Sequence, residues 1–154
     1  MPTRLRDIAS KVRRTAGKWL DDGYRPDEFT QRLLVSVAGM TERGNVAALE
    51  YAIQHMPEGA VVEIGIFAGQ STVLLDHLVR KHKRCAPVWS TDVWVYDGVD
   101  DSKPFASSAE KSTYLRCVAA REDLERGAYL AHIKSQFIAN CRFYCKDRLP
   151  AAFD

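Results

Sequence analysis

The segment from Ala60 to Leu75 most constrains what this chain can fold into. Its first residues, Ala-Val-Val-Glu-Ile, are mostly β-branched and apolar on both faces, which is typical of a buried parallel strand. They lead into a glycine turn and then into a helix that extends to about His82, with Ser71 or Thr72 predicted as its cap. A strand that passes through glycines directly into a helix is typical of α/β proteins with a parallel sheet.

The remainder of the chain supplies further elements of the same class. Apolar spacing, turn residues and β-branched runs predict helices at about 5–19, 28–38, 45–56, 108–126 and 129–140, and strands at 87–92 and 141–145. We therefore predict an α/β fold with a Rossmann-like parallel sheet that is preceded by helices. Residues 1–38 form an N-terminal helical region, and residues 39–154 form the ligand-binding domain.

Two features at the carboxyl ends of the predicted strands indicate a ligand that contains a nucleoside. Gly65 and Gly69 allow the backbone to approach a ligand closely, and the helix that follows offers free N–H groups. Asp92 ends the second strand, 23 residues beyond Gly69. An acidic side chain at that place accepts hydrogen bonds from a ribose diol, because ligands of open α/β sheets lie beyond the strand ends.

The turn departs from the dinucleotide pattern G-x-G-x-x-G. Phe67 occupies the place of the second glycine, and Ser71 and Thr72 occupy the region of the third. The chain has instead E-x-G-x-[aromatic]-x-G-x-S, in which Glu63 stands two residues before the first glycine. A carboxylate there suits a ligand with an ammonium, such as the methionine part of S-adenosylmethionine, better than a pyrophosphate. The pattern therefore disfavours a nucleotide-binding oxidoreductase.

The run from Val62 to Ser71 resembles motif I of class I S-adenosylmethionine-dependent methyltransferases, and most closely that of small-molecule O-methyltransferases of the catechol and macrocin types. Residues 39–45 are similar to the segment that, in the catechol type, closes over the methionine end of the cofactor. Residues 142–150 resemble the third strand and cofactor-facing turn of the macrocin type. The resemblance implies the Rossmann-like sheet of class I methyltransferases.

The resemblance also implies roles for individual residues. Glu63 would lie near the methionine ammonium, and Asp92 would hold the ribose hydroxyls. Asp147 or its backbone neighbours would approach the adenine. The methionine-binding turn and the segment closing over it would comprise Gly65, Phe67, Gly69, Ser71, Met40 and Thr41. On the alternative interpretation, the glycines and Asp147 are ordinary turn residues and Asp92 caps a strand end.

No catalytic base and no metal ligands can be assigned from the sequence. A divalent cation such as magnesium is compatible with the family, and the loop 97–101 could bind it, line the acceptor site or form a solvated lid. The four cysteines form no C-x-x-C pair, and the histidines lack metal-ligand spacing. We therefore expect buried free thiols rather than a zinc site or disulfides at Cys85, Cys117, Cys141 and Cys145.

Composition and charge indicate where in the cell we expect the protein and which partners it contacts. The chain has 154 residues and a net charge of +2, and no apolar run approaches the ~18 residues of a membrane span. No apolar core of a secretory signal is present, so we expect a cytoplasmic protein. The first twenty residues form a basic amphipathic helix. It could contact an anionic membrane, contact phosphates or act as a transit peptide, but we favour a helix packed on the domain and no nucleic-acid partner.

The predicted sheet leaves one strand exposed. In class I methyltransferases strand four pairs with strand one, and here residues 151–154 stand where strand four is expected to begin. Strand one would then be an open edge, which invites pairing with another chain. Three explanations follow: the chain is part of a longer enzyme, it pairs with a second copy in a homo-oligomer or with a partner chain, or it is a shortened module. We favour the first. We expect O-methyl transfer to a small molecule or sugar; the alternative is a non-catalytic cofactor- or partner-binding module.

Overall fold

The computed structural model describes residues 17, 23–92, 94, 108, 126–146 and 151–153. The elements follow in the order α2 (Glu28–Ser36), α3 (Arg43–His55), β1 (Val61–Ile64), α4 (Gln70–Lys81), β2 (Val88–Thr91), α6 (Arg126–Cys145) and β3 (Ala151–Phe153). The first five lie within two residues of their predicted bounds. Apart from residues 17, 108 and 126, the predicted basic helix, the loop 97–101 and the helix 108–126 lie outside the described residues.

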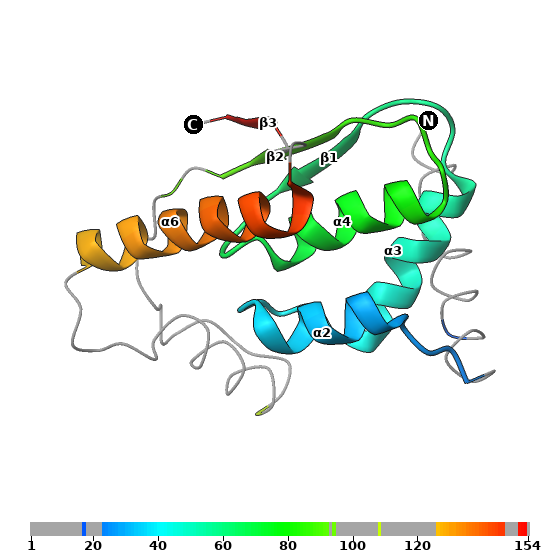
Figure 1. The fold of residues 1–154 in the computed structure, drawn as a ribbon, viewed down its shortest axis with the longest axis horizontal. Coiled ribbons are helices and arrows are strands. Elements are labelled where there is room, and N and C mark those ends of the chain that lie inside the picture. The colour runs from blue at the N-terminus through cyan, green and yellow to red at the C-terminus, as the bar shows by residue number, and fades with distance from the viewer. Residues whose placement is uncertain are drawn as a thin grey trace.

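The strands form one parallel sheet in the order β1-β2-β3. Val61 pairs with Val88 at the start of β1, and Thr91 of β2 pairs with Phe153 of β3. The prediction of an α/β fold with a parallel sheet is confirmed at this level. In Figure 1 the strands lie along the top, α4 and α6 lie below them, and α2 lies on the far side of α4.

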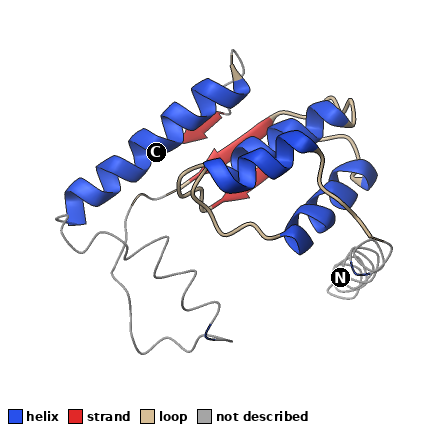
Figure 2. Ribbon diagram, turned by 60° about the horizontal axis from the view of Figure 1, so that its bottom comes forward, coloured by secondary structure: helices blue, strands red, loops and turns tan. Residues whose placement is uncertain are grey.

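Helix α4 is the centre of the core. Leu74 and Leu78 on α4 are fully buried, together with Leu33 of α2 and Val46 of α3. Each such side chain stabilises the fold by about 1.5–3 kcal/mol relative to an exposed one. Figure 2 shows α6 running alongside α4 in a second orientation, with the strands behind both helices. The packing therefore fixes the N-terminus of α4 against the carboxyl end of β1.

The predicted strand over residues 141–145 is wrong, because these residues form the last turn of α6. The aromatic residues suggested a strand, but the buried residues recur every four positions, as on one face of a helix: Ile133, Phe137, Cys141 and Cys145. In a strand Phe143 would share a face with Cys141 and Cys145, yet it is 75% exposed while both cysteines are buried. The third strand is Ala151–Phe153, so the prediction that strand four begins there is wrong as well.

Strand β1 is buried on one face only, which corrects the prediction that both faces are covered. Glu63 points toward the helices and is 9% exposed. Val62 and Ile64 point to the opposite side and are 64% and 85% exposed. Among the described strands β1 is also an edge, as predicted, because β2 is its one neighbour in that part of the chain. Within the described residues, no helix combines the length and apolar character needed to cross a membrane.

Candidate functional site

A cavity of about 350 Å³ lies at the carboxyl end of β1. It is bounded by the turn after β1, the first turn of α4, the loop before α3 and the first turns of α3. The described residues that line it are Gly39, Met40, Thr41, Asn45, Ala48, Leu49, Gly65, Ile66, Phe67, Gln70 and Ser71. This is the end of a parallel sheet at which α/β proteins bind ligands.

The turn from Gly65 to Gly69 has an unusual backbone. Gly65, Phe67 and Gly69 all have left-handed φ angles, of 85°, 51° and 87°. Glycine adopts this region freely, whereas a phenylalanine there costs about 1–2 kcal/mol. A Cβ atom on Gly65 would meet no atom within 4 Å, but one on Gly69 would lie 2.9 Å from the ring of Phe137. Gly65 therefore leaves space in front of the turn, and Gly69 lets α6 pack closely behind it.

Side chains from distant parts of the chain hold this turn. The carboxylate of Asp92, just after β2, accepts a hydrogen bond from the Ile66 N–H at 2.7 Å. The side-chain amide of Asn140 on α6 donates to the Ala68 carbonyl at 2.9 Å. Within the turn, the Gly69 N–H donates to the Ile66 carbonyl at 3.1 Å. The conformation of the turn is therefore specified by contacts on both of its sides.

Gln70 fixes the opposite wall of the cavity. Its side-chain oxygen accepts a hydrogen bond from the Thr41 N–H at 3.0 Å, and its side-chain nitrogen donates to the Val37 carbonyl at 2.7 Å. A Cβ atom on Gly39 would overlap the Gln70 side chain, so glycine is needed at position 39. One buried amide thus joins the loop between α2 and α3 to the first turn of α4.

The cavity wall is uncharged and lies beside the first turns of two helices. Among the described residues that line it, none is Asp, Glu, Lys or Arg. Asn45 and Ser71 belong to the first turns of α3 and α4. Helix N-termini carry a partial positive charge and N–H groups without helical partners. The end of α3 is closed by a capping box of Glu42 and Asn45. The end of α4, whose cap Gly69 has no side chain, is the place suited to a carboxylate or another small anionic group beside an apolar body.

Five of the residues predicted from the sequence line this cavity: Met40, Thr41, Gly65, Phe67 and Ser71. Gly69 lies behind the turn, against Phe137 and Cys141. Glu63 and Asp92 do not line the cavity. The buried Glu63 carboxylate accepts hydrogen bonds from the hydroxyls of Thr72 and Ser90. Asp147 lies outside the described residues.

The predicted helix cap is wrong. The N-cap of α4 is Gly69, and no side chain caps the helix there. Thr72, which was predicted as a possible cap, donates its hydroxyl to Glu63 instead. Since a glycine cap has no side chain, the first N–H groups of α4 receive no side-chain acceptor. The result is a helix end whose donors remain available beside the cavity.

Three residues that shape the site were not predicted: Gln70, Phe137 and Asn140. Gln70 stands directly after the second glycine of the turn, and a buried polar residue at a helix start is a signal that could have drawn attention to it. Asn140 is 72 positions from its partner Ala68, and Phe137 is similarly distant from Gly69. No local pattern predicts such contacts.

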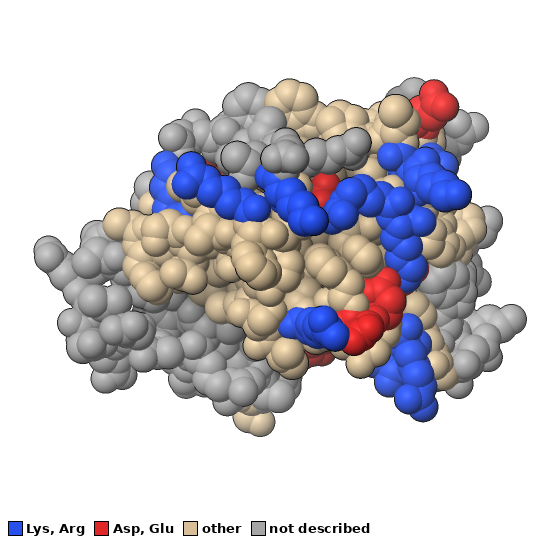
Figure 3. Space-filling model, viewed as in Figure 1, with Lys and Arg blue, Asp and Glu red and all other residues tan. Residues whose placement is uncertain are grey.

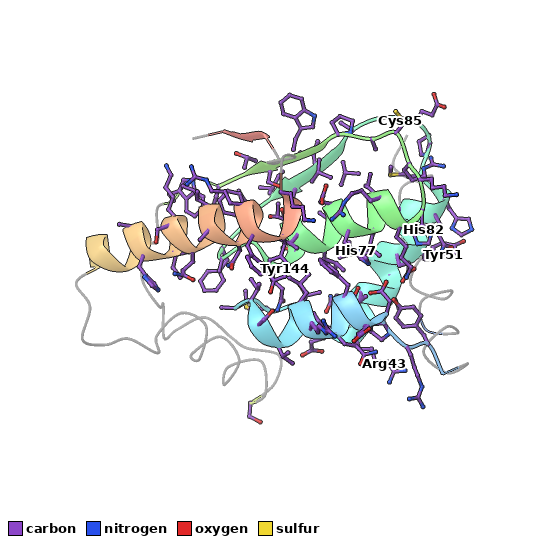
Figure 4. All side chains as sticks on the ribbon, viewed as in Figure 1. Arg43, Tyr51, His77, His82, Cys85 and Tyr144 are labelled. Carbon is purple, nitrogen blue, oxygen red and sulfur yellow. The ribbon has the colours of Figure 1, made fainter. Side chains whose placement is uncertain are left out.

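A second cluster of polar side chains joins α2, α3 and α4 on the other side of the core. Glu50 of α3 accepts from the Tyr24 hydroxyl at 2.5 Å and contacts Lys81 Nζ at 2.6 Å and His82 Nε2 at 2.9 Å. Lys81 also contacts Asp27 at 2.9 Å. We call Tyr24, Asp27, Glu50, His77, Lys81 and His82 the ionic cluster. In Figure 4 the labelled His77 lies on α4 and His82 lies just beyond its end.

The ionic cluster shifts the protonation of its members. Burial opposes ionisation of Asp27, but hydrogen bonds from His77, Lys81 and Thr30 outweigh it and hold the pKa of Asp27 below its usual range. Burial likewise opposes ionisation of Glu50, and hydrogen bonds from Lys81, Tyr24 and His82 lower its pKa. Burial acts to lower the pKa of Lys81, but the carboxylates of Glu50 and Asp27 outweigh burial and raise this pKa above its usual range. The cluster is thus a set of mutually satisfied charges.

Basic side chains gather away from the cavity. Figure 3 shows a band of Lys and Arg across the face that α4 and α6 form. The sequence of α6 contains no acidic residue, and the Asp76 carboxylate of α4 pairs with Arg80 at 2.7 Å. The described residues include no group of three or more His, Cys, Asp or Glu that could hold a metal ion. Ligands for the predicted cation are therefore not assigned.

The cysteines follow the prediction in part. Cys141 and Cys145 are free and buried, as predicted, whereas Cys85 is exposed. A hydrogen bond with Cys145, together with burial, raises the pKa of the Cys141 thiol. Cys117 lies outside the described residues. The buried thiols contribute packing beneath the turn rather than reactivity.

Comparison with models of protein families, with curated proteins and with solved structures found no match to this chain.

Proposed function

We propose that this chain binds S-adenosylmethionine and is, or is the cofactor-binding part of, a class I methyltransferase of Rossmann-like fold. The observation that carries the proposal is the cavity at the carboxyl end of β1, enclosed by a glycine turn and two helix N-termini. Its place relative to the parallel sheet is that of a nucleoside-ligand site in α/β proteins. The likeness of residues 62–71 to motif I of methyltransferases supports the same conclusion.

The residues of the cavity fit the methionine end of this cofactor. The first turn of α4, with Ser71 and a glycine cap, would receive the carboxylate. Met40, Leu49 and Phe67 offer an apolar surface for the methylene groups of the methionine part. The open space in front of Gly65 allows a ligand to approach the backbone. Glu63 lies behind the turn, so we infer that it supports the site electrostatically instead of contacting the ammonium.

When bound, S-adenosylmethionine would supply an electrophilic methyl group on a sulfonium. An oxygen of a small-molecule or sugar acceptor would form the new bond to this carbon as the carbon–sulfur bond breaks, and the acceptor hydroxyl would lose its proton to a base. The contribution of this chain is to hold and orient the donor, which in such transfers supplies much of the rate enhancement. We assign neither the base nor a magnesium site to the described residues.

Calorimetric titration with S-adenosylhomocysteine, the demethylated product, tests the proposal. The critical variant is Gly65→Leu and its matched control is Gly23→Leu. Both glycines have left-handed φ angles, of 85° and 80°, and a Cβ on either would meet no atom within 4 Å. The two substitutions therefore impose the same backbone strain, but Gly65 lines the cavity and Gly23 does not.

We expect the wild-type chain and Gly23→Leu to bind S-adenosylhomocysteine with similar affinity and Gly65→Leu to lose at least about tenfold, since a side chain would occupy the ligand's space. No binding by the wild-type chain, or equal binding by both variants, would contradict the proposal. Binding of NAD in place of S-adenosylhomocysteine would favour a nucleotide-binding oxidoreductase. Binding without methyl transfer to any acceptor would favour the non-catalytic module.

A further inference from the structure

The turn that forms the cavity wall holds one residue, Phe67, in a backbone conformation that its side chain does not favour. Three of its five residues have left-handed φ angles, and Phe67 does so without the freedom of glycine. Non-glycine residues persist in this region where surrounding contacts hold them. The contacts that hold the turn therefore also determine the shape of the cavity.

Asp92 supplies the main contact on the sheet side of the turn. One carboxylate oxygen accepts from the Ile66 N–H at 2.7 Å and lies 3.5 Å from the Phe67 nitrogen. The other oxygen accepts from the Trp94 N–H at 2.8 Å. Charge-assisted bonds of this kind are about twice as strong as neutral ones. Both oxygens are thus engaged with backbone, and the side chain does not line the cavity.

Trp94 connects this contact to the helix on the other side of the turn. Its ring lies 5.7 Å from the ring of Phe137, centroid to centroid, and Lys134 Nζ lies 5.6 Å from its ring centroid. Phe137 itself packs against Gly69. The side chains therefore form a continuous path from Ile66 through Asp92 and Trp94 to α6, which returns to the turn at Gly69.

We propose that Asp92 is a positioning residue: it acts on a ligand in the cavity through the backbone of the turn, and it couples the turn to Trp94. This rests on the proposed function insofar as the ligand is S-adenosylmethionine or its product. On this proposal Asp92 improves binding of any ligand that lies on the turn, whether or not the ligand carries ribose hydroxyls. It differs in this respect from a carboxylate that contacts only a ribose diol.

The experiment compares Asp92→Ala with Asp27→Ala in the full chain. Asp27 is a matched control because its carboxylate also accepts a backbone N–H, from Thr30 at 2.9 Å, at a place remote from the cavity. Without ligand, NMR-detected hydrogen exchange should quicken at least about tenfold at the amides of Ile66 and Phe67 in Asp92→Ala and stay unchanged in Asp27→Ala. Tryptophan emission should change in Asp92→Ala, and the change should vanish in a Trp94→Phe background.

Titration completes the test with two ligands, S-adenosylhomocysteine and its 2′,3′-dideoxyribose analogue. We expect Asp92→Ala to weaken the binding of both ligands by the same factor, about tenfold. Asp27→Ala should leave the binding of both unchanged. Weakening of S-adenosylhomocysteine alone would show that Asp92 acts on the ribose and would overturn the proposal. Unchanged exchange at Ile66 and Phe67 would overturn it as well. If the wild-type chain binds neither ligand, the proposed function fails, while the exchange and emission results still decide whether Asp92 holds the turn.

Discussion

The glycine turn and the ionic cluster both join distant parts of the chain, but they do so by opposite means. The turn presents a neutral cavity, left-handed backbone angles and a helix end without a side-chain cap. The ionic cluster places four charged or titratable groups around Glu50 and Asp27, and each carboxylate is engaged by several donors. Helix α3 contributes to both, with its first turns at the cavity and Glu50 in its later part.

This difference indicates that the turn serves ligand binding and that the ionic cluster serves stability. A site retains strained backbone and available donors because a ligand can use them, at the expense of folding free energy. A cluster whose charges satisfy one another has little left for a ligand and instead fixes helices in place. We therefore expect substitutions on the cavity side of the turn to alter affinity. Substitutions in the cluster, or at Gly69 where the turn packs against α6, should alter stability. The following predictions test that separation.

The largest effect is expected from Gly69→Ala. The new methyl group would lie 2.9 Å from the Phe137 ring on a residue with φ of 87°. Crowding and backbone strain together should lower the free energy of unfolding by about 2–4 kcal/mol. Gly23→Ala has comparable φ and open space, and should cost only about 1 kcal/mol. Urea denaturation measures both, and equal losses would show that α6 does not pack tightly behind the turn.

Glu50→Gln should lower the stability of the fold without lowering its affinity for the ligand. The variant keeps the shape of the side chain but removes the charge that Tyr24, Lys81 and His82 contact. We expect the free energy of unfolding to fall by about 1–2 kcal/mol, discounted for partial exposure of Lys81. The dissociation constant for S-adenosylhomocysteine should stay within about twofold. A tenfold loss of affinity would show that the cluster and the cavity are not separate.

Low pH should destabilise the fold through the ionic cluster. The folded-state pKa values of Asp27 and Glu50 lie below their ordinary values of 3.8 and 4.5. Their contribution to stability is therefore complete above those ordinary values and is lost as the pH falls toward the lower folded-state values. Lys81, with a raised pKa, contributes fully below its ordinary value of 10.5 and loses its contribution at higher pH.

Denaturation curves between pH 7 and pH 3 measure this effect. The wild-type chain should lose stability as the pH falls below about 5, and the combined variant Asp27→Asn/Glu50→Gln should show a shallower slope over the same interval. Identical slopes in the two proteins would assign the acid sensitivity to other carboxylates.

The smallest effect concerns the thiols behind the turn. N-ethylmaleimide should modify the exposed Cys85 and spare Cys141 and Cys145 in the native chain, because these are buried and the pKa of Cys141 is raised. Peptide mapping by mass spectrometry gives the extent at each site. Gly69→Ala should make Cys141 reactive, whereas Glu50→Gln should leave it protected. Equal labelling of Cys141 in both variants would show that the thiol does not depend on the packing behind the turn.

The sequence predicted the parts of the molecule that depend on local pattern. The β-branched run, the glycines and the helical spacing after them were sufficient to locate β1, the turn and α4. The turn contributed Gly65, Phe67 and Ser71 to the predicted cavity lining, and the family resemblance added Met40 and Thr41. These features are local because strand propensity, left-handed turns and amphipathic helices are encoded within a few residues.

The errors have a common cause, which is tertiary contact. Residues 141–145 resemble a strand by composition, but the burial of Phe137, Cys141 and Cys145 on one face stabilises a helix instead. Asp92 was correctly placed at the end of β2, yet its engagement with Ile66 depends on how two strands align. Asn140 reaches the turn from 72 positions away, and neither residue carries a local signal of that contact.

Hydrogen–deuterium exchange with and without S-adenosylhomocysteine tests the central claim, that the turn and its cavity bind the ligand, most directly. We predict slower exchange in residues 39–49 and 65–71 when the ligand is saturating, and unchanged exchange in α2 and in the second half of α4. Protection confined to the ionic cluster, or no protection in residues 65–71, would contradict the claim.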